Sequence, residues 1–397
     1  MPVDANDEVR SAFHEHLARW GLKRFMSDRD YFAWQRRQLS SADLNHLNRQ
    51  VELKRSGDYR DEIAFYDLTS RPTIRSVIHS QRYDYYEAVG LSVASRLGDA
   101  RRVLDFGCGT GILTTFYARR FPDKEFIAID RSPASIAAAR QQSKEMGQTN
   151  VRFDCLDVER ESLRGSFDLI LATQALMQAE QDPGIPSESW RTFTRAHHAE
   201  RQTDFEQRTG IGARLDRLGA VLDSAGRMVV CEKVRHLARR VPFQRALADR
   251  GFQLIEPPGS IRYRLIEEAV DDGPLYVVQK GRGSSLVWDE SPERDEGLVF
   301  DRNTGVAVQT DSSRPLYENH WPSAQTAWEQ LKDRAVTQEM TRQQSDGRQV
   351  HVELGISDEV RYLYCANTFD QRQLVIVEPA RAAILKDYYQ EIIGGMP

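Results

Sequence analysis

The sequence has no apolar run that approaches the about 20 residues a membrane-spanning helix needs. Its N-terminus is polar and acidic, which is not the pattern of a secretory signal. Its four cysteines lie far apart and form no paired spacing that would hold a metal ion. These absences predict a cytoplasmic protein with reduced thiols, no membrane partner and no metal site.

The chain also lacks a basic excess, because 54 lysines and arginines stand against 59 acidic residues and give a net charge of −5. A chain that wraps DNA or RNA is expected to carry a clustered basic excess, so a nucleic-acid partner is not expected. One stretch, residues 233–250, is locally basic. A solvated helix face explains it, although it would support a macromolecular substrate if it lined a groove.

A length of 397 residues predicts two or three domains, at roughly 100–200 residues per domain. Residues 1–90 look helical and are expected to form a lid, a substrate wall or an oligomer contact. Residues 91–282 carry a different pattern and are expected to form the central domain. One helix is expected over residues 71–97, leading into that domain.

Residues 283–397 begin with a polar linker and predict a small C-terminal α+β accessory domain. Its expected elements are a hairpin around residues 302–305, a helix over residues 322–340, a three-stranded meander and a final helix. Dimerisation or capping of a substrate is the simplest role for such a module, so a homodimer is one expected form of the protein.

Short apolar runs alternate with amphipathic stretches in the central region. The runs are "RVLDFG", "EFIAID", "VRFDCLD", "FDLILAT" and "GRMVVCE". Such alternation predicts βαβ units and a parallel sheet that is buried on both faces. "GFQLIEP" and "PLYVVQKG" are expected to close the sheet as two further strands. The fold class is therefore α/β, with a doubly wound sheet.

The first apolar run ends in a glycine-rich turn, "VLDFGCGTG", in which Gly107, Gly109 and Gly111 occupy alternate positions. A strand, a glycine turn and a helix in this order favour a nucleotide-like ligand at the carboxyl end of a parallel sheet. A tight turn alone would also explain the glycines. However, Asp130 ends the second run and suits ribose hydroxyls, while Asp157 follows the third and suits an exocyclic amine.

These residues in this order resemble the class I S-adenosylmethionine-dependent methyltransferases, over roughly residues 100–280. The resemblance implies a Rossmann-like sheet, S-adenosylmethionine as cofactor and methyl transfer as the activity. It also implies the residues that contact the cofactor: Asp105, Gly107, Cys108, Gly109, Gly111, Asp130, Arg131, Asp157, Val158 and Thr173. A nicotinamide dehydrogenase is the main alternative, but its GxGxxG spacing differs from the GxGxG found here.

The acceptor is less constrained, because methyl transfer needs alignment more than fixed catalytic groups. "LATQALMQ" lacks the Asn/Asp-Pro-Pro-aromatic loop of enzymes that methylate DNA bases. The paired glutamates of arginine methyltransferases are also missing. We therefore expect a nitrogen or oxygen of a small molecule as acceptor. A protein or RNA substrate and a non-catalytic, cofactor-binding role stay open as alternatives.

Two regions could close the acceptor site. The long segment over residues 178–212 contains His197 and His198, either of which could act as a proton acceptor, although a solvated helix explains both. The helix before the sheet contains Tyr86, which could shape the acceptor pocket, and Arg82, which could pair with the cofactor's carboxylate. Packing on the sheet and simple surface exposure are the competing explanations for these two residues.

Overall fold

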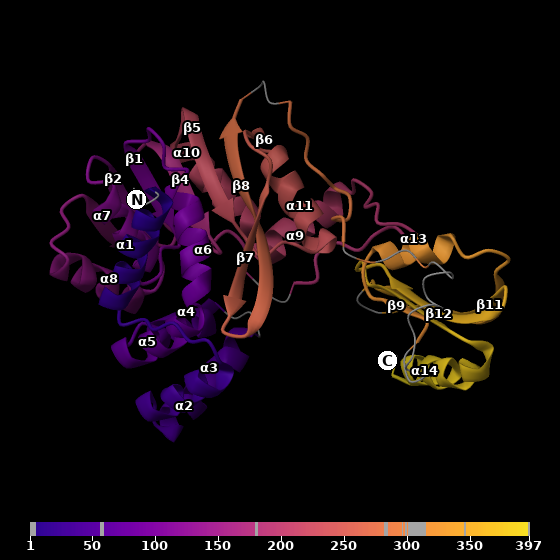
Figure 1. Cartoon of the computed structure of the whole chain (residues 1–397). Coiled ribbons are helices and arrows are strands. Elements are labelled where there is room, and N and C mark those ends of the chain that lie inside the picture. The colour runs from indigo at the N-terminus through magenta and orange to yellow at the C-terminus, as the bar shows by residue number, and fades with distance from the viewer. Residues whose placement is uncertain are drawn as a thin grey trace. The chain divides into compact units, whose positions relative to one another are not determined.

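The computed structural model describes residues 5–55, 59–178, 182–281, 285–295, 297, 300, 315–344 and 347–395. The chain divides into two compact units, each coloured by position along the chain in Figure 1. The first unit comprises residues 1–182, 203–235 and 243–288, and the second comprises residues 183–202, 236–242 and 289–397. The chain therefore enters the second unit three times. The domain boundaries expected at residues 90 and 282 remain predictions.

The N-terminal part of the first unit is helical, as expected. Its helices are α1 (Ala5–Arg19), α2 (Asp28–Gln38), α3 (Ser41–Arg55), α4 (Tyr59–Thr69), α5 (Pro72–Gln81) and α6 (Tyr83–Ala94). The single helix expected over residues 71–97 is wrong. Arg82 leaves helical geometry, with φ −101° and ψ 24°, and so separates α5 from α6.

A mixed sheet forms the core of the first unit. Its strands are β1 (Arg102–Phe106), β2 (Glu125–Asp130), β3 (Val151–Cys155), β4 (Phe167–Thr173), β5 (Leu222–Cys231), β6 (Phe252–Leu254), β7 (Gly259–Leu265) and β8 (Glu268–Lys280). The order is β3-β2-β1-β4-β5-β8-β6, with β7 paired to β8. Strands β1 to β5 pair in parallel, whereas β8 is antiparallel to β5, β6 and β7. This arrangement confirms the expected Rossmann-like α/β fold.

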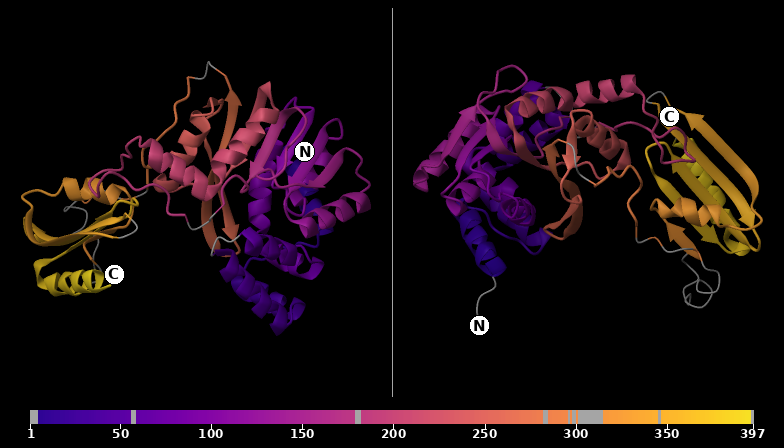
Figure 2. Two further views of the ribbon diagram at one scale, coloured as in Figure 1. Left: turned by 180° about the vertical axis from the view of Figure 1, so that it is seen from behind. Right: turned by 90° about the horizontal axis from the view of Figure 1, so that it is seen from above.

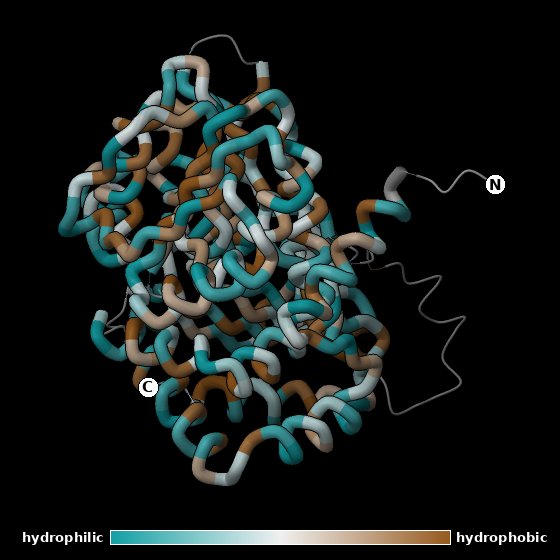
Figure 3. Tube along the Cα trace, turned by 90° about the vertical axis from the view of Figure 1, so that its left-hand side faces the viewer, coloured by the Kyte–Doolittle hydropathy of each residue, from teal (hydrophilic) through white to brown (hydrophobic). Residues whose placement is uncertain are grey.

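Strand β3 leads directly to β4, but helices follow the other parallel strands, as βαβ units require. They are α7 (Ile112–Arg120), α8 (Pro133–Glu145), α9 (Ala199–Thr209), α10 (Ile211–Val221) and α11 (Leu237–Ala248). Val103 of β1 and Leu169 of β4 are fully buried in one cluster with Phe13 of α1, Val89 of α6 and Phe116 of α7. Figure 3 colours the chain by hydropathy, from teal for hydrophilic to brown for hydrophobic residues. The helical N-terminal segment thus shares its core with the sheet.

The second unit contains an antiparallel sheet of order β10-β11-β12-β13-β9. Its strands are β9 (Tyr317–Asn319), β10 (Ala335–Gln343), β11 (Gln349–Ser357), β12 (Val360–Asn367) and β13 (Arg372–Val377). Helix α13 (Ser323–Glu329), the short helix η1 (Pro379–Arg381) and α14 (Ala382–Gly394) complete it. Helix α14 lies along one face of this sheet (Figure 2), and its Leu385 and Tyr389 are buried in one cluster with residues of β11, β12 and β13.

The expected meander is present as β11, β12 and β13, but the helix expected over residues 322–340 is wrong. Helix α13 ends at Glu329, and residues 335–343 instead form the edge strand β10. The hairpin expected around residues 302–305 lies outside the described residues. Within the part of the chain that the structure describes, no helix is both long and apolar enough to cross a membrane.

Candidate active site

The glycine turn after β1 puts all three glycines in the left-handed region, with φ of 71° at Gly107, 54° at Gly109 and 79° at Gly111. A Cβ on Gly107 would lie 2.3 Å from Cβ of Ala175, and one on Gly111 would lie 2.8 Å from the Phe153 ring. A Cβ on Gly109 would meet nothing within 4 Å. Two glycines therefore permit close packing, and the third presents bare backbone to open space.

Two carboxylates hold the turn in place. Asp105 is buried and accepts a hydrogen bond of 2.5 Å from the Thr114 hydroxyl, and burial raises its pKa to about 7. Asp130 accepts hydrogen bonds from the backbone N–H of Gly109, at 2.9 Å, and of Ser132, at 2.8 Å. Burial raises the pKa of Asp130 as well. Asp130 thus joins the loops after β1 and β2, at the carboxyl edge of the sheet.

Helix α4 contacts the same edge through three polar side chains that the sequence analysis did not identify. The Tyr59 hydroxyl donates to Asp157 at 2.7 Å, and Glu62 forms an ion pair with Arg131. Asp67 accepts a hydrogen bond of 2.6 Å from the Ser132 hydroxyl. The structure therefore brings α4 onto the loops that carry the predicted ribose and adenine contacts. No motif marks these residues, because their role depends on how α4 packs.

Asp157, Val158 and Cys108 lie near this edge in different environments. Besides Tyr59, Asp157 accepts the backbone N–H of Glu159 at 3.0 Å, so it caps the turn that follows β3. Val158 is buried. Cys108 is partly exposed, and burial of its thiol raises its pKa well above the usual value, which keeps the thiol protonated.

Arg82 reaches the end of β4, where Thr173 is the last strand residue. Its guanidinium donates to the side-chain oxygen of Gln174 at 2.7 Å and stacks on the Tyr85 ring at 4.1 Å. Within the described residues Arg82 forms no ion pair with a carboxylate. Gln174 has a φ of 52°, and its buried side-chain nitrogen has no hydrogen-bond partner among the described residues. The Gln174 amide nitrogen is therefore available to a further hydrogen-bond partner at the end of β4.

Tyr86 hydrogen-bonds through its hydroxyl to Nδ1 of His79 at 2.7 Å. Burial lowers the pKa of His79 to about 3 and raises the pKa of Tyr86 to about 12. Both groups are therefore neutral near pH 7. Tyr86 lies in the same buried cluster as the strands, so it packs the helix on the sheet as well as bonding to His79.

His197 and His198 are exposed and belong to the second unit, whereas the glycine turn belongs to the first. They precede α9 and so do not lie on it.

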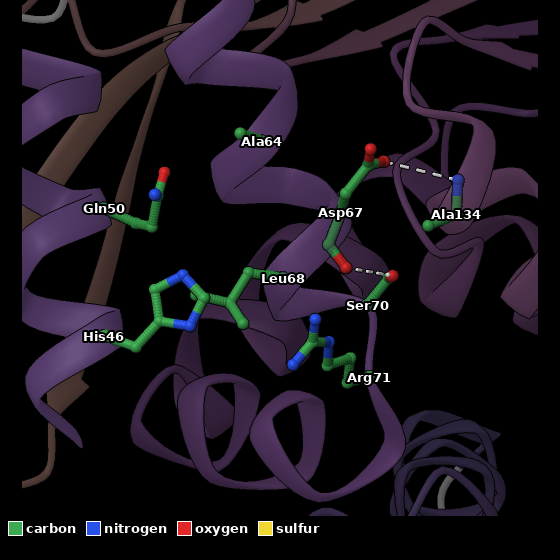
Figure 4. A pocket seen from close by; sticks show the side chains of 8 residues that line it. All are labelled: His46, Gln50, Ala64, Asp67, Leu68, Ser70, Arg71 and Ala134. Carbon is green, nitrogen blue, oxygen red and sulfur yellow. Dashed lines mark hydrogen bonds between the residues drawn. The ribbon is translucent and has the colours of Figure 1, made fainter. Parts of the chain in front are cut away.

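A pocket of about 460 Å³ also lies in the first unit (Figure 4). Residues of α3, α4, the turn after α4 and the start of α8 line it: His46, Gln50, Ala64, Asp67, Leu68, Ser70, Arg71 and Ala134. Asp67 accepts the backbone N–H of Ala134 at 3.3 Å across it. None of the residues predicted to contact the cofactor lines this pocket.

Comparison with known proteins identifies the central domain. Residues 97–240 match the model of a family described as a methyltransferase domain. A malonyl-[acyl-carrier protein] O-methyltransferase of Acetivibrio thermocellus is 36% identical over 102 residues, which cover 24% of this chain and 35% of the relative. A trans-aconitate 2-methyltransferase of Deinococcus radiodurans is 36% identical over 89 residues, which cover 22% and 32%. The chain thus spans about a third of the length of these relatives.

Among solved structures, the N-methyltransferase NodS of Bradyrhizobium japonicum, in complex with S-adenosylhomocysteine, is 17% identical. The similarity covers 50% of this chain and 89% of NodS, with a TM-score of 0.34. The family match and the sequence relatives agree with the motif order and the strand order described above. Residues 97–240 are therefore similar to a family of methyltransferase domains, and the motifs found there are those of the class I, S-adenosylmethionine-dependent methyltransferases.

Proposed function

We propose that the whole chain binds S-adenosylmethionine and transfers its methyl group to an oxygen or nitrogen of a small-molecule acceptor. The observation that carries this proposal is the geometry of the glycine turn. Gly109 presents bare backbone to open space, and Asp130 lies directly beside it, hydrogen-bonded to its N–H. This is the arrangement that a nucleoside needs at the carboxyl edge of a parallel sheet.

The residues present fit the cofactor from one end to the other. Asp130 would accept the ribose hydroxyls, and Asp157, with the backbone of Val158, would contact the adenine. Arg131 and Cys108 would line the same path. At the other end, Arg82 would pair with the cofactor's carboxylate. The lack of any carboxylate partner for Arg82 in the described residues, and the unsatisfied amide of Gln174, support that assignment.

When bound, S-adenosylmethionine supplies an electrophilic methyl group on a positively charged sulfur. The chain's own residues would hold that group beside the end of β4, near Thr173, and buried side chains such as Tyr85 would exclude water from it. The methyl group would go to a lone pair of the acceptor, and the sulfur would keep the electron pair of its former bond to carbon. An acceptor that carries a proton must lose it, and Tyr86, His197 and His198 stay our candidates for groups that assist.

A small acceptor is favoured by two observations. The relatives are named for methyl transfer to malonyl-[acyl-carrier protein] and to trans-aconitate. In addition, arginines of the basic stretch are engaged within the protein, because Arg235 pairs with Asp271, and Arg250 pairs with Glu206 and Asp216. The stretch therefore offers little free charge for a nucleic-acid backbone.

The test is calorimetry of the full chain with S-adenosylhomocysteine. We expect the wild type to bind and Asp130→Ala to lose on the order of 1.5–3 kcal/mol of binding free energy, the usual contribution of hydrogen bonds to a charged group. Asp123→Ala is the control, because Asp123 is exposed and lies at the opposite end of β2. A wild-type chain that does not bind the ligand would overturn the proposal.

A further inference from the structure

We propose that the second unit contains a binding site for one divalent transition-metal ion of the zinc class, formed by Glu339, His351 and Glu353. One nitrogen or oxygen atom from each side chain lies within 4.8 Å of those of the other two. His351 and Glu353 are buried, and Glu339 is exposed. No cysteine takes part, and all three residues belong to the second unit.

Strand register brings the three residues together. His351 and Glu353 are two apart on β11, so their side chains share one face of the sheet. Glu339 lies directly opposite Glu353, and Thr341 lies directly opposite His351, in the antiparallel pairing of β10 with β11. The ligands therefore come from two rigid, hydrogen-bonded strands, which hold their positions better than a loop would.

The distances suit a metal ion better than a direct hydrogen bond. Nε2 of His351 lies 3.4 Å from the nearer carboxylate oxygen of Glu353, which is long for a hydrogen bond. Two ligand atoms at 2.0–2.2 Å from a tetrahedral zinc ion are about 3.3–3.6 Å apart. The distance between Nε2 of His351 and the carboxylate oxygen of Glu353 therefore matches the distance between two ligand atoms of a tetrahedral zinc ion.

The surrounding residues orient both buried ligands. Nδ1 of His351 hydrogen-bonds to the Thr341 hydroxyl at 2.8 Å, which leaves Nε2 to face the ion. The other oxygen of Glu353 accepts the Tyr362 hydroxyl at 2.5 Å and the Trp328 indole N–H at 3.2 Å. Metal-binding histidines and carboxylates in proteins are supported by outer hydrogen bonds of this kind.

Packing fixes the histidine ring further. The Trp190 ring stacks on His351, with centroids 3.6 Å apart and planes 1° apart. Tyr362 reaches Glu353 across Gly355, where an added Cβ would lie 2.3 Å from the tyrosine ring. Two buried ligands and a third on the exposed edge strand form a three-ligand site. The buried imidazole nitrogen favours zinc, because magnesium and calcium prefer sites made of oxygen ligands alone.

The experiment titrates Zn²⁺ into the metal-free full chain and measures affinity with a competing chromophoric chelator. We expect one ion per chain, and no comparable binding of Mg²⁺ or Ca²⁺. Glu339→Gln should weaken Zn²⁺ binding at least tenfold, and Thr341→Val should weaken it about 10–100-fold. Co²⁺ in place of Zn²⁺ should give the strong visible absorption of a tetrahedral site without a thiolate band.

Two variants complete the design. His351→Ala removes a ligand but also disturbs the packing of Trp190, so Glu339→Gln, at an exposed position, is the decisive change. His320→Ala is the matched control, because His320 forms an exposed pair with Glu318 at 2.7 Å in the same unit. Absence of Zn²⁺ binding by the wild type would overturn the proposal. Binding unchanged in Glu339→Gln would overturn it as well.

Discussion

In the turn after β1, Gly107 and Gly109 have different roles. Gly107 and Gly109 both have positive φ, so alanine at either position costs a similar backbone strain of about 1–2 kcal/mol. Only at Gly107 would the new methyl collide with Ala175. Only at Gly109 would it enter the open space assigned to the cofactor. The two substitutions therefore form a matched pair with different expected effects.

We expect Gly107→Ala to lower the unfolding free energy by about 1–3 kcal/mol more than Gly109→Ala does, the usual cost of overpacking. We expect Gly109→Ala to keep most of its stability and to lose affinity for S-adenosylhomocysteine. Denaturant unfolding and calorimetry on the same samples measure the two effects. Equal stability loss with unchanged ligand affinity in Gly109→Ala would show that this glycine serves the turn alone.

Because the Asp105 carboxyl group is buried, we expect the unfolding free energy of the protein to depend on pH. The folded pKa of Asp105, about 7, lies above the ordinary carboxyl value of 3.8, because the group is buried. The folded state therefore holds more protons than the unfolded state between these values, and stability falls as pH rises through this window. A tenfold difference in proton affinity between the folded and unfolded states corresponds to about 1.4 kcal/mol.

We expect Asp105→Asn to remove that contribution, since an amide does not ionise. Urea unfolding at several pH values between 4 and 8 should show the wild type losing stability relative to the variant as pH rises. A constant difference between the two proteins across this range would contradict the assignment.

At the scale of elements, α4 is the feature most closely tied to the candidate active site. Tyr59, Glu62 and Asp67 attach it to the loops after β2 and β3. Glu62→Gln and Tyr59→Phe should loosen this attachment and accelerate release of S-adenosylhomocysteine, by on the order of tenfold if each contact contributes about 1–1.5 kcal/mol. Stopped-flow displacement measures the rate.

Glu52→Gln is the control for this prediction, because Glu52 forms an exposed pair with Arg55 on the neighbouring helix α3. Such surface pairs contribute little. If Glu52→Gln accelerates ligand release as much as Glu62→Gln does, general loosening of the N-terminal helices explains the effect, and α4 has no special role.

The helices and strands of the structure also show which parts of the fold could be predicted from the sequence. The parallel strands and the glycine turn were predictable because buried β-strands and turn glycines leave local signals. Strand β10 was not, because nearly all its residues are exposed and only pairing with β11 makes it a strand. For the same reason the contacts of α4 and the pairing of Glu339 with Glu353 were missed. They depend on partners distant in sequence.

At the scale of the whole molecule, the second unit is held together by segments far apart in the chain. Ser187 donates its backbone N–H to Thr368 at 2.7 Å, and Arg195 forms an ion pair with Asp370 at 2.5 Å. Trp190 is buried in a cluster with Tyr362 and Tyr364. Residues 183–202 are therefore an integral part of this unit.

A chain cut near residue 290 should consequently stay in one piece under native conditions. Limited proteolysis should give two bands on a denaturing gel that elute together from a size-exclusion column, and separate only in denaturant. Arg195→Ala combined with Trp190→Ala should weaken this association. Separation of the wild-type fragments in native buffer would show that the C-terminal part is an independent module.

The second unit is built from three segments of the chain, and the ribosome synthesises these segments at different times. Residues 183–202 leave the ribosome about 150 residues before β11 to β13, which cover Trp190. At a synthesis rate of about 5–20 residues per second, Trp190 lacks these strands for roughly 7–30 s. The first unit, whose last strand ends at Lys280, can assemble earlier. We therefore expect newly made chains to pass through a stage at which a completed methyltransferase fold carries a segment whose partner strands have not yet been synthesised.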